Sequence, residues 1–127
     1  MSEHGVTPVF DGRDVVFTVS NAKGEDEGIE FIASLDARDQ ARFEYLLQKL
    51  DLGARLKSPE HMRPLSGKDP GGTLAKVHEL KSHNKGGLRL YVVEFERRWY
   101  ITHGTRKVSD RLVPKQVAKA FSIWNGE

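Results

Sequence analysis

The chain has 127 residues, 38% of them hydrophobic and 30% charged, which is typical of one soluble globular domain, here expected to span residues 1–127. It has no cysteine, which excludes disulfides and thiolate metal sites, and no apolar run approaches the roughly 20 residues that a membrane-spanning helix needs. Residues 1–80 hold ten Lys and Arg against fourteen Asp and Glu, whereas residues 81–120 hold ten against three. The net charge of +2 therefore hides one strongly basic region, and we expect a cytoplasmic protein with a polyanionic partner such as nucleic acid.

The first half of the chain predicts one strand and two helices. Residues 1–13 are expected to form a flexible tail, and the β-branched and aromatic residues of 14–20 predict a strand. A short helix is expected over residues 29–35, and Asp36 can cap a second helix that ends at Gly53. The second helix carries an apolar stripe at i, i+3, i+4 and i+7, formed by Phe43, Leu46, Leu47 and Leu50. We expect the two helices to pair in a purely structural role.

The second half predicts three consecutive strands and a last helix. Proline and glycine make residues 57–73 a connection, and strands are expected over residues 74–81, over 88–95 and from Trp99 onward. Pro114 suits the first turn of the final helix. The order β-α-α-β-β-β-α predicts an α+β fold, with a small, mainly antiparallel sheet and helices packed on one face. The strand at 88–95 is apolar on both sides, so its pattern does not decide which face stays open.

The basic region contains the groups that metal-free cleavage of RNA requires. That reaction needs a base near the 2′-OH, cations beside the phosphate and an acid for the leaving oxygen. The candidate cations are Lys81, Arg89, Arg106 and Lys107, and the candidate proton carriers are His78, Glu79 and His103. Each has an ordinary structural alternative, since Arg89 can reach solvent from a strand end and His103 can be a core histidine. The five histidines are scattered without metal-binding spacing, so we expect neither a metal nor a cofactor.

Several short motifs occur in an order that carries a family resemblance. They are GIEFIASL from Gly28, LDLGARL from Leu50, PLSG from Pro64, VHELK from Val77, GLRLY from Gly87 and ITHG from Ile101, followed by Arg106 and Lys107 and by Pro114. Each motif is weak alone, but their order and spacing over roughly residues 14–120 are specific. The chain resembles the HigB-like, phage-derived branch of the RelE/ParE superfamily, the toxins of bacterial toxin–antitoxin pairs.

The resemblance implies a RelE-like domain that cleaves mRNA, usually on the ribosome, without a metal ion. It also implies neutralisation by an antitoxin, typically a helix-turn-helix protein. By the same resemblance Arg89 contacts the reacting phosphate, and Arg106 or Lys107 matches a basic pair after the fourth strand. Glu79 and Lys81 match a Glu-Leu-Arg signature, and His103 matches a strand-end histidine. The expected RNA contacts of the second strand are Lys76, His78 and Lys81, and whether Lys76 or Lys81 faces the phosphate stays open.

The sequence also departs from the pattern of this superfamily. His78 replaces the aromatic residue that usually precedes the signature, Lys81 replaces its arginine, and Thr105 stands where an aromatic residue is common. No tyrosine follows the basic pair, which disfavours a tyrosine-assisted mechanism. Two alternatives therefore stay open because one fold supports several functions: a non-enzymatic inhibitor such as a ParE-like gyrase poison, and an inactive binding module with a toxin fold.

Overall fold

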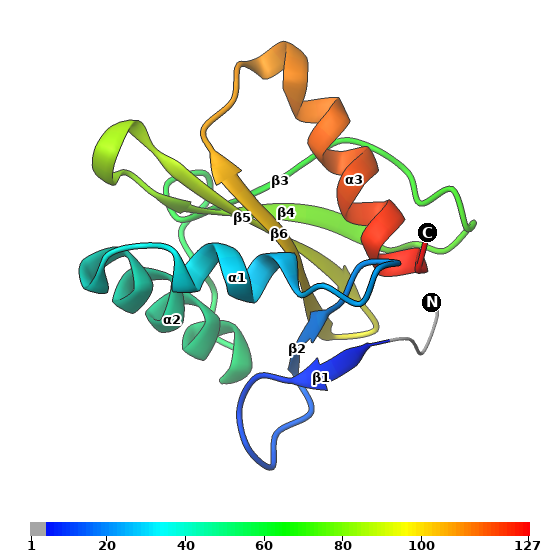
Figure 1. Cartoon of the computed structure of the whole chain (residues 1–127), viewed down its shortest axis with the longest axis horizontal. Coiled ribbons are helices and arrows are strands. Elements are labelled where there is room, and N and C mark those ends of the chain that lie inside the picture. The colour runs from blue at the N-terminus through cyan, green and yellow to red at the C-terminus, as the bar shows by residue number, and fades with distance from the viewer. Residues whose placement is uncertain (1–4) are drawn as a thin grey trace.

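The β-forming segments of the chain pair into one twisted sheet, which carries three helices (Figure 1). The computed structural model describes residues 5–127. The strands are β1 (Val6–Pro8), β2 (Val16–Val19), β3 (Met62–Pro64), β4 (Lys76–Ser82), β5 (Leu88–Phe95) and β6 (Arg98–Arg106). They lie in the order β1-β2-β6-β5-β4-β3, and only the pairing of β2 with β6 is parallel. The prediction of an α+β fold with a mainly antiparallel sheet is confirmed.

Helices α1 (Glu27–Ala33) and α2 (Ala37–Asp51) follow the local sequence signals closely. The side chain of Asp36 accepts a hydrogen bond from the backbone N–H of Asp39 at 3.0 Å, which caps α2 as predicted. At the other end Gly53 has a φ of +75°, and the N–H of Ala54 donates to the carbonyl of Lys49 at 3.0 Å. The predicted stripe of α2 is buried against the sheet.

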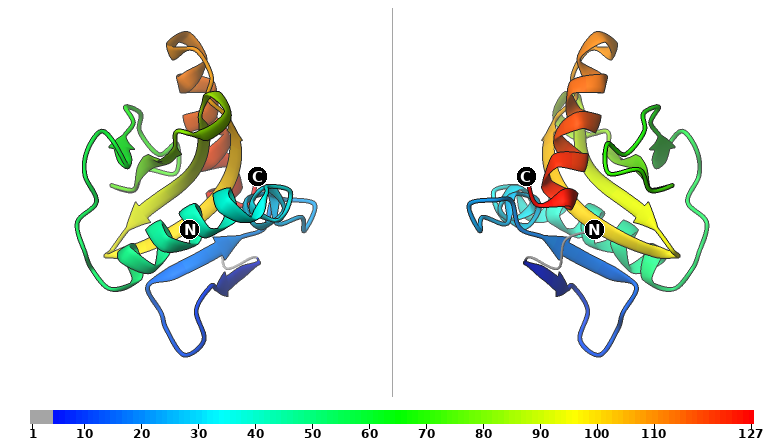
Figure 2. Two further views of the ribbon diagram at one scale, coloured as in Figure 1. Left: turned by 90° about the vertical axis from the view of Figure 1, so that its left-hand side faces the viewer. Right: turned by 90° about the vertical axis from the view of Figure 1, so that its right-hand side faces the viewer.

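The third helix, α3 (Val113–Asn125), packs on the face of the sheet opposite to α1 and α2. Phe121 and Trp124 of α3 join Tyr91 and Val93 of β5 in one core, whereas Leu90 belongs to a second core under α2. In the side views of Figure 2, α3 (orange to red) rises above the level of α2 (teal), and β1 and β2 (blue) lie below both helices. The prediction that all helices pack on one face is therefore wrong. The reason is that β5 is apolar on both sides, and each side needs a covering layer.

Two short edge strands were not predicted. Of the expected tail at 1–13, residues 1–4 lie outside the described residues, but Val6–Pro8 form β1 and pair with β2. The predicted connection at 57–73 contains β3, whose terminal Pro64 is tolerated because β3 is an edge strand. Strand β3 matters for function because it places Arg63 opposite Glu79 of β4. Within residues 5–127, no helix is long and apolar enough to cross a membrane.

Candidate functional site

The pairing register gathers charged side chains at one end of the sheet. Lys81 of β4 pairs with Arg89 of β5, and Glu79 pairs with Tyr91 on one side and Arg63 on the other. Paired residues share a face, so these side chains lie on the face that α3 covers. Alternation along β4 puts Glu79 and Lys81 on the same face of the strand.

A small pocket of about 110 Å³ opens between these side chains and the segment that leads into α3. Its lining consists of Arg63, Glu79, Lys81, Arg89, Lys107, Val108, Asp110 and Val113. Four cations and two carboxylates therefore face one small space, which leaves the pocket net positive. Val113 is the first residue of α3, so the positive end of that helix dipole lies beside the pocket. This arrangement suits an anion the size of a phosphate group.

Glu79 holds the two arginines of this pocket in place. Its Oε1 lies 2.9 Å from Nη2 of Arg63 and 3.7 Å from Nε of Arg89. Glu79 and Arg89 are only 3% and 5% exposed, so each buried charge depends on the other for compensation. The Nη1 group of Arg89 also donates to the carbonyl of Leu88 at 3.0 Å. The Arg89 guanidinium is therefore fixed before any ligand arrives.

Gly87 makes room for this guanidinium. Its φ is +105°, and a Cβ built on it would lie 3.3 Å from Nη1 of Arg89 and 3.1 Å from Cβ of Lys107. The carbonyl of Gly87 accepts a hydrogen bond from the N–H of Lys107 at 3.0 Å. A side chain at this position would crowd both cations, so the glycine brings Lys107 and Arg89 close together.

Lys81 is a cation of the pocket whose pKa is shifted by its surroundings. Burial lowers the pKa of Lys81, and the nearby charges of Arg89, Arg63 and Lys107 lower this pKa further, against the opposing effect of Glu79. An amine with a lowered pKa gives up its proton at a lower pH than an ordinary lysine does. The surroundings of Lys81 therefore favour the loss of its proton.

His103 lies in the core instead of lining the pocket. It is 1% exposed, its ring stacks on Tyr91 with centroids 4.6 Å apart, and its Nε2 lies 2.9 Å from Oε1 of Gln116 in α3. Burial lowers the pKa of His103 to about 4, so the imidazole is neutral at physiological pH. In this position His103 supports Tyr91, which in turn packs beneath the pocket.

Arg106 lies on the other face of the sheet. It pairs with Leu88, whose side chain belongs to the core under α2. The charge of Arg106 acts on Lys85. The hydrogen bond to Asp36 raises the pKa of Lys85, and the positive charge of Arg106 lowers this pKa slightly. The pairing at this strand end therefore separates Arg106 from Arg89, although the next residue, Lys107, lines the pocket.

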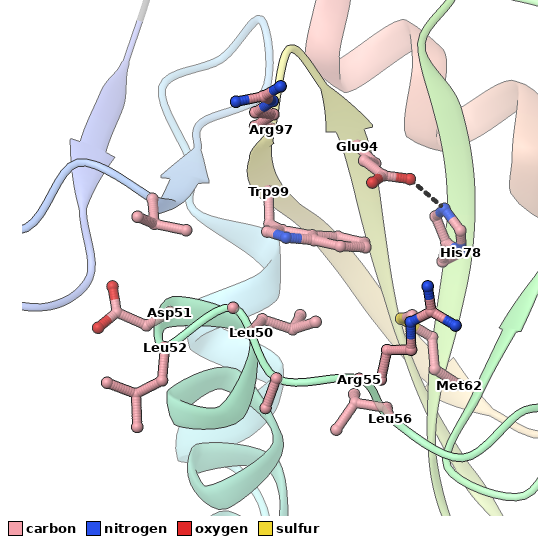
Figure 3. A pocket seen from close by; sticks show the side chains of 13 residues that line it. Leu50, Asp51, Leu52, Arg55, Leu56, Met62, His78, Glu94, Arg97 and Trp99 are labelled. Atoms are coloured by element: carbon pink, nitrogen blue, oxygen red, sulfur yellow. Dashed lines mark hydrogen bonds and ion pairs between the residues drawn. The ribbon is translucent and has the colours of Figure 1, made fainter.

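Lys76 and His78 also lie on the face opposite to Arg89. His78 sits in a hollow of about 580 Å³ between the end of α2 and the sheet (Figure 3). Its Nε2 lies 2.9 Å from Oε1 of Glu94, and its ring packs edge-on to Trp99 at 5.2 Å. Burial lowers the pKa of His78, and the contact with Glu94 offsets this only in part. The three expected RNA contacts of this strand are therefore split, and only Lys81 reaches the pocket.

The sequence reasoning missed Arg63 and Asp110. Arg63 belongs to a strand of three residues, which is too short for an alternating pattern to reveal. The Pro64-Leu-Ser-Gly67 motif did mark this segment, but not the residue before it. Among residues 5–127, no group of three or more His, Asp or Glu side chains is arranged to hold a metal ion.

Comparison with known protein families gives a match over most of the chain. Residues 30–125 match the family model described as "Phage derived protein Gp49-like (DUF891)". The matched range includes α2, β3 to β6, α3 and every residue of the pocket. No curated protein and no solved structure matches the chain.

Proposed function

The chain belongs to the Gp49-like family of phage-derived proteins, part of the RelE/toxin-type superfamily, and from this premise we propose that it is the toxin of a toxin–antitoxin pair. We further propose that it is a metal-independent endoribonuclease that cleaves mRNA, with the ribosome as the place of cleavage and a helix-turn-helix antitoxin as its partner. The observation that carries this proposal is the pocket around Arg89, a net positive space of phosphate size at the end of a rigid sheet.

The proposed reaction uses the 2′-OH of the substrate as the nucleophile. The 2′ oxygen bonds to phosphorus while the bond from phosphorus to the 5′ oxygen breaks, which leaves a 2′,3′-cyclic phosphate and a 5′-OH. Arg89 holds two phosphate oxygens and stabilises the charge that builds on them, because a planar guanidinium fits two oxygens at once. Glu79 acts as a positioning residue, since it fixes Arg89 and Arg63.

Two lysines complete the proposed mechanism. Lys81, in its neutral form, accepts the proton of the 2′-OH, and its lowered pKa supports that role. Lys107 lies at the exposed rim of the pocket and donates a proton to the departing 5′ oxygen. His103 and His78 have no proton-transfer role in this scheme because neither lines the pocket. Arg106 is likewise outside the proposed phosphate contact.

The experiment is induction of this chain alone in bacterial cells, followed by mapping of new mRNA 5′ ends. The wild type is expected to arrest growth and to create new 5′-OH ends, and Lys107→Ala is expected to reduce both. Lys115→Ala is the matched control, because Lys115 is an exposed lysine of α3 that does not line the pocket. Growth arrest with DNA breakage and without new mRNA ends would overturn the proposal in favour of a gyrase poison. Harmless expression would point to an inactive binding module.

A further inference from the structure

Helix α2 carries a second group of cations, arranged around an exposed aromatic ring. Arg38, Arg42, Tyr45 and Lys49 recur at i, i+4, i+7 and i+11, so they form one stripe along the helix. The Tyr45 ring is 48% exposed, with Cζ of Arg42 at 5.9 Å and Nζ of Lys49 at 5.4 Å from its centroid. A tyrosine that stays in solvent contributes little to the core, and a base can stack on its ring when one of the two flexible cations over the ring moves aside.

A hollow of about 650 Å³ adjoins this stripe, between α2 and the turn after β4. Arg38, Arg42 and Tyr45 line one side, and His83 and Asn84 line the other. The hollow and the stripe together, with Lys49, form what we call the α2 surface.

In the part of the chain that the structure describes, Asp39 is the only acidic residue that lines this hollow, and hydrogen bonds occupy its carboxylate. Asp39 is 1% exposed and accepts from Oγ of Ser82 at 3.2 Å and from Nδ2 of Asn84 at 3.1 Å. These bonds also fix the turn after β4 against α2. Nearby, burial lowers the pKa of His61, and the charges of Arg42 and Lys57 lower it further. The accessible part of the α2 surface is therefore basic.

The α2 surface and the pocket around Arg89 lie on two sides of the same strand end. Lys81 and Ser82 are consecutive residues of β4, so their side chains point to opposite faces. Lys81 lines the pocket, and Ser82 lines the hollow beside α2. Figure 1 shows the turn between β4 and β5 at the same end of the molecule as the start of α2. A flexible chain that occupies the pocket can therefore continue around this turn.

We propose that the α2 surface is a second binding site for single-stranded RNA, in which Tyr45 stacks on an unpaired base and Arg38, Arg42 and Lys49 contact the flanking phosphates. The identity of the ligand as RNA rests on the proposed function. A single strand fits because only unpaired bases expose a face for stacking. A protein partner fits less well, because the surface offers one aromatic ring among cations instead of an apolar core.

The test uses a fluorescently labelled 2′-O-methyl RNA of about 12 nucleotides, which lacks the nucleophile and stays intact during titration. Tyr45→Leu removes the stacking ring at an exposed position and is expected to weaken binding about 5-fold to 100-fold. Arg42→Gln combined with Lys49→Gln is expected to weaken binding and to lower the slope of log affinity against log salt by about 1.4. Lys23→Gln combined with Lys115→Gln removes two exposed cations elsewhere and is the matched control.

The outcomes separate this inference from the proposed function. If the α2 variants bind the RNA like the wild type while Lys107→Ala weakens binding, the inference is overturned and the pocket stands. If the α2 variants bind the RNA more weakly but the wild type creates no new mRNA 5′ ends, the α2 surface is supported as an RNA-binding site and the cleavage proposal is overturned. If a double-stranded RNA of the same length binds equally well and Tyr45→Leu changes nothing, base stacking is overturned. A wild type that binds no RNA overturns this inference, whereas the cleavage proposal is decided separately by the mapping of mRNA 5′ ends in cells.

Discussion

The two faces of the sheet beside the β4–β5 turn carry similar cations in different settings. On the face of α3, Arg89 is buried, and Glu79 holds its guanidinium in a small pocket. On the face of α2, Arg42 borders a wider hollow beside the exposed Tyr45. Buried and paired cations keep a fixed geometry, which stabilising a transition state requires. Exposed cations on flexible side chains adapt to a ligand, which suits binding without chemistry.

The largest expected effect on the α3 face comes from Lys81→Met, which removes the amine but keeps much of the apolar stem. If Lys81 transfers the proton, the RNA cleavage rate should fall about 100-fold to 10,000-fold. The wild-type rate should rise with pH as Lys81 loses its proton, and the rate of the variant should not follow this profile. The check is a pH profile of single-turnover cleavage, with Lys76→Met on the opposite face as the control. Equal pH profiles for wild type and Lys81→Met would refute the role of Lys81.

The next largest effect is a loss of folding stability, because the carboxylate of Glu79 balances the positive charges of two arginines. Glu79→Gln leaves the buried Arg89 without its carboxylate, and we expect the free energy of unfolding to fall by about 3 kcal/mol. The matched control on the α2 face is Glu94→Gln, whose partner is His78 and whose side chain is 39% exposed. That change should cost less than about 1 kcal/mol. Urea unfolding of both variants measures the difference, and equal losses would contradict the distinction between the two faces.

A smaller effect concerns the pH dependence of stability. Burial lowers the pKa of folded His103 to about 4, whereas an unfolded histidine titrates near about 6.5. Between these two pKa values the unfolded chain therefore binds more protons than the folded chain does. The contribution of the neutral His103 to the free energy of unfolding is complete above about pH 6.5, and it is lost as the pH falls toward 4. From pH 7 to pH 5 the loss should be about 2 kcal/mol.

Denaturant unfolding at both pH values tests this expectation. His103→Gln should remove the loss because glutamine does not titrate. His78→Gln is the control on the other face, where the pKa is lowered by burial but Glu94 offsets the effect in part. A loss that persists unchanged in His103→Gln would show that other groups cause it.

Much of the fold follows from local patterns in the sequence. The cap at Asp36, the stripe of α2 and the end of α2 at Gly53 each have a local cause, and each was predicted. The number of covered faces was not predictable in the same way, because β5 is apolar on both sides and only the packing of α3 reveals the second layer.

The candidate site depended more strongly on contacts between distant residues. The pairing of Arg106 with Leu88 determines the face of the sheet on which Arg106 lies. The three-residue strand β3 brings Arg63 next to Glu79. Burial between β6 and α3 is what keeps His103 neutral and away from the pocket. Residue types and their spacing can be read from the sequence alone. The pairing register at strand ends and the depth at which a side chain is buried cannot.

In the proposed mechanism, Arg89 holds the phosphate on the face of α3. The most direct measurement compares single-turnover cleavage of ribosome-bound mRNA by Arg89→Lys with that by Arg106→Lys, the same change on the opposite face. Lysine keeps the charge but loses the planar fork, so Arg89→Lys should slow cleavage about 100-fold to 1,000-fold. Arg106→Lys should stay within about twofold of the wild type because Arg106 lies outside the pocket. Equal losses in the two variants, or a loss in Arg106→Lys alone, would show that Arg89 does not hold the phosphate.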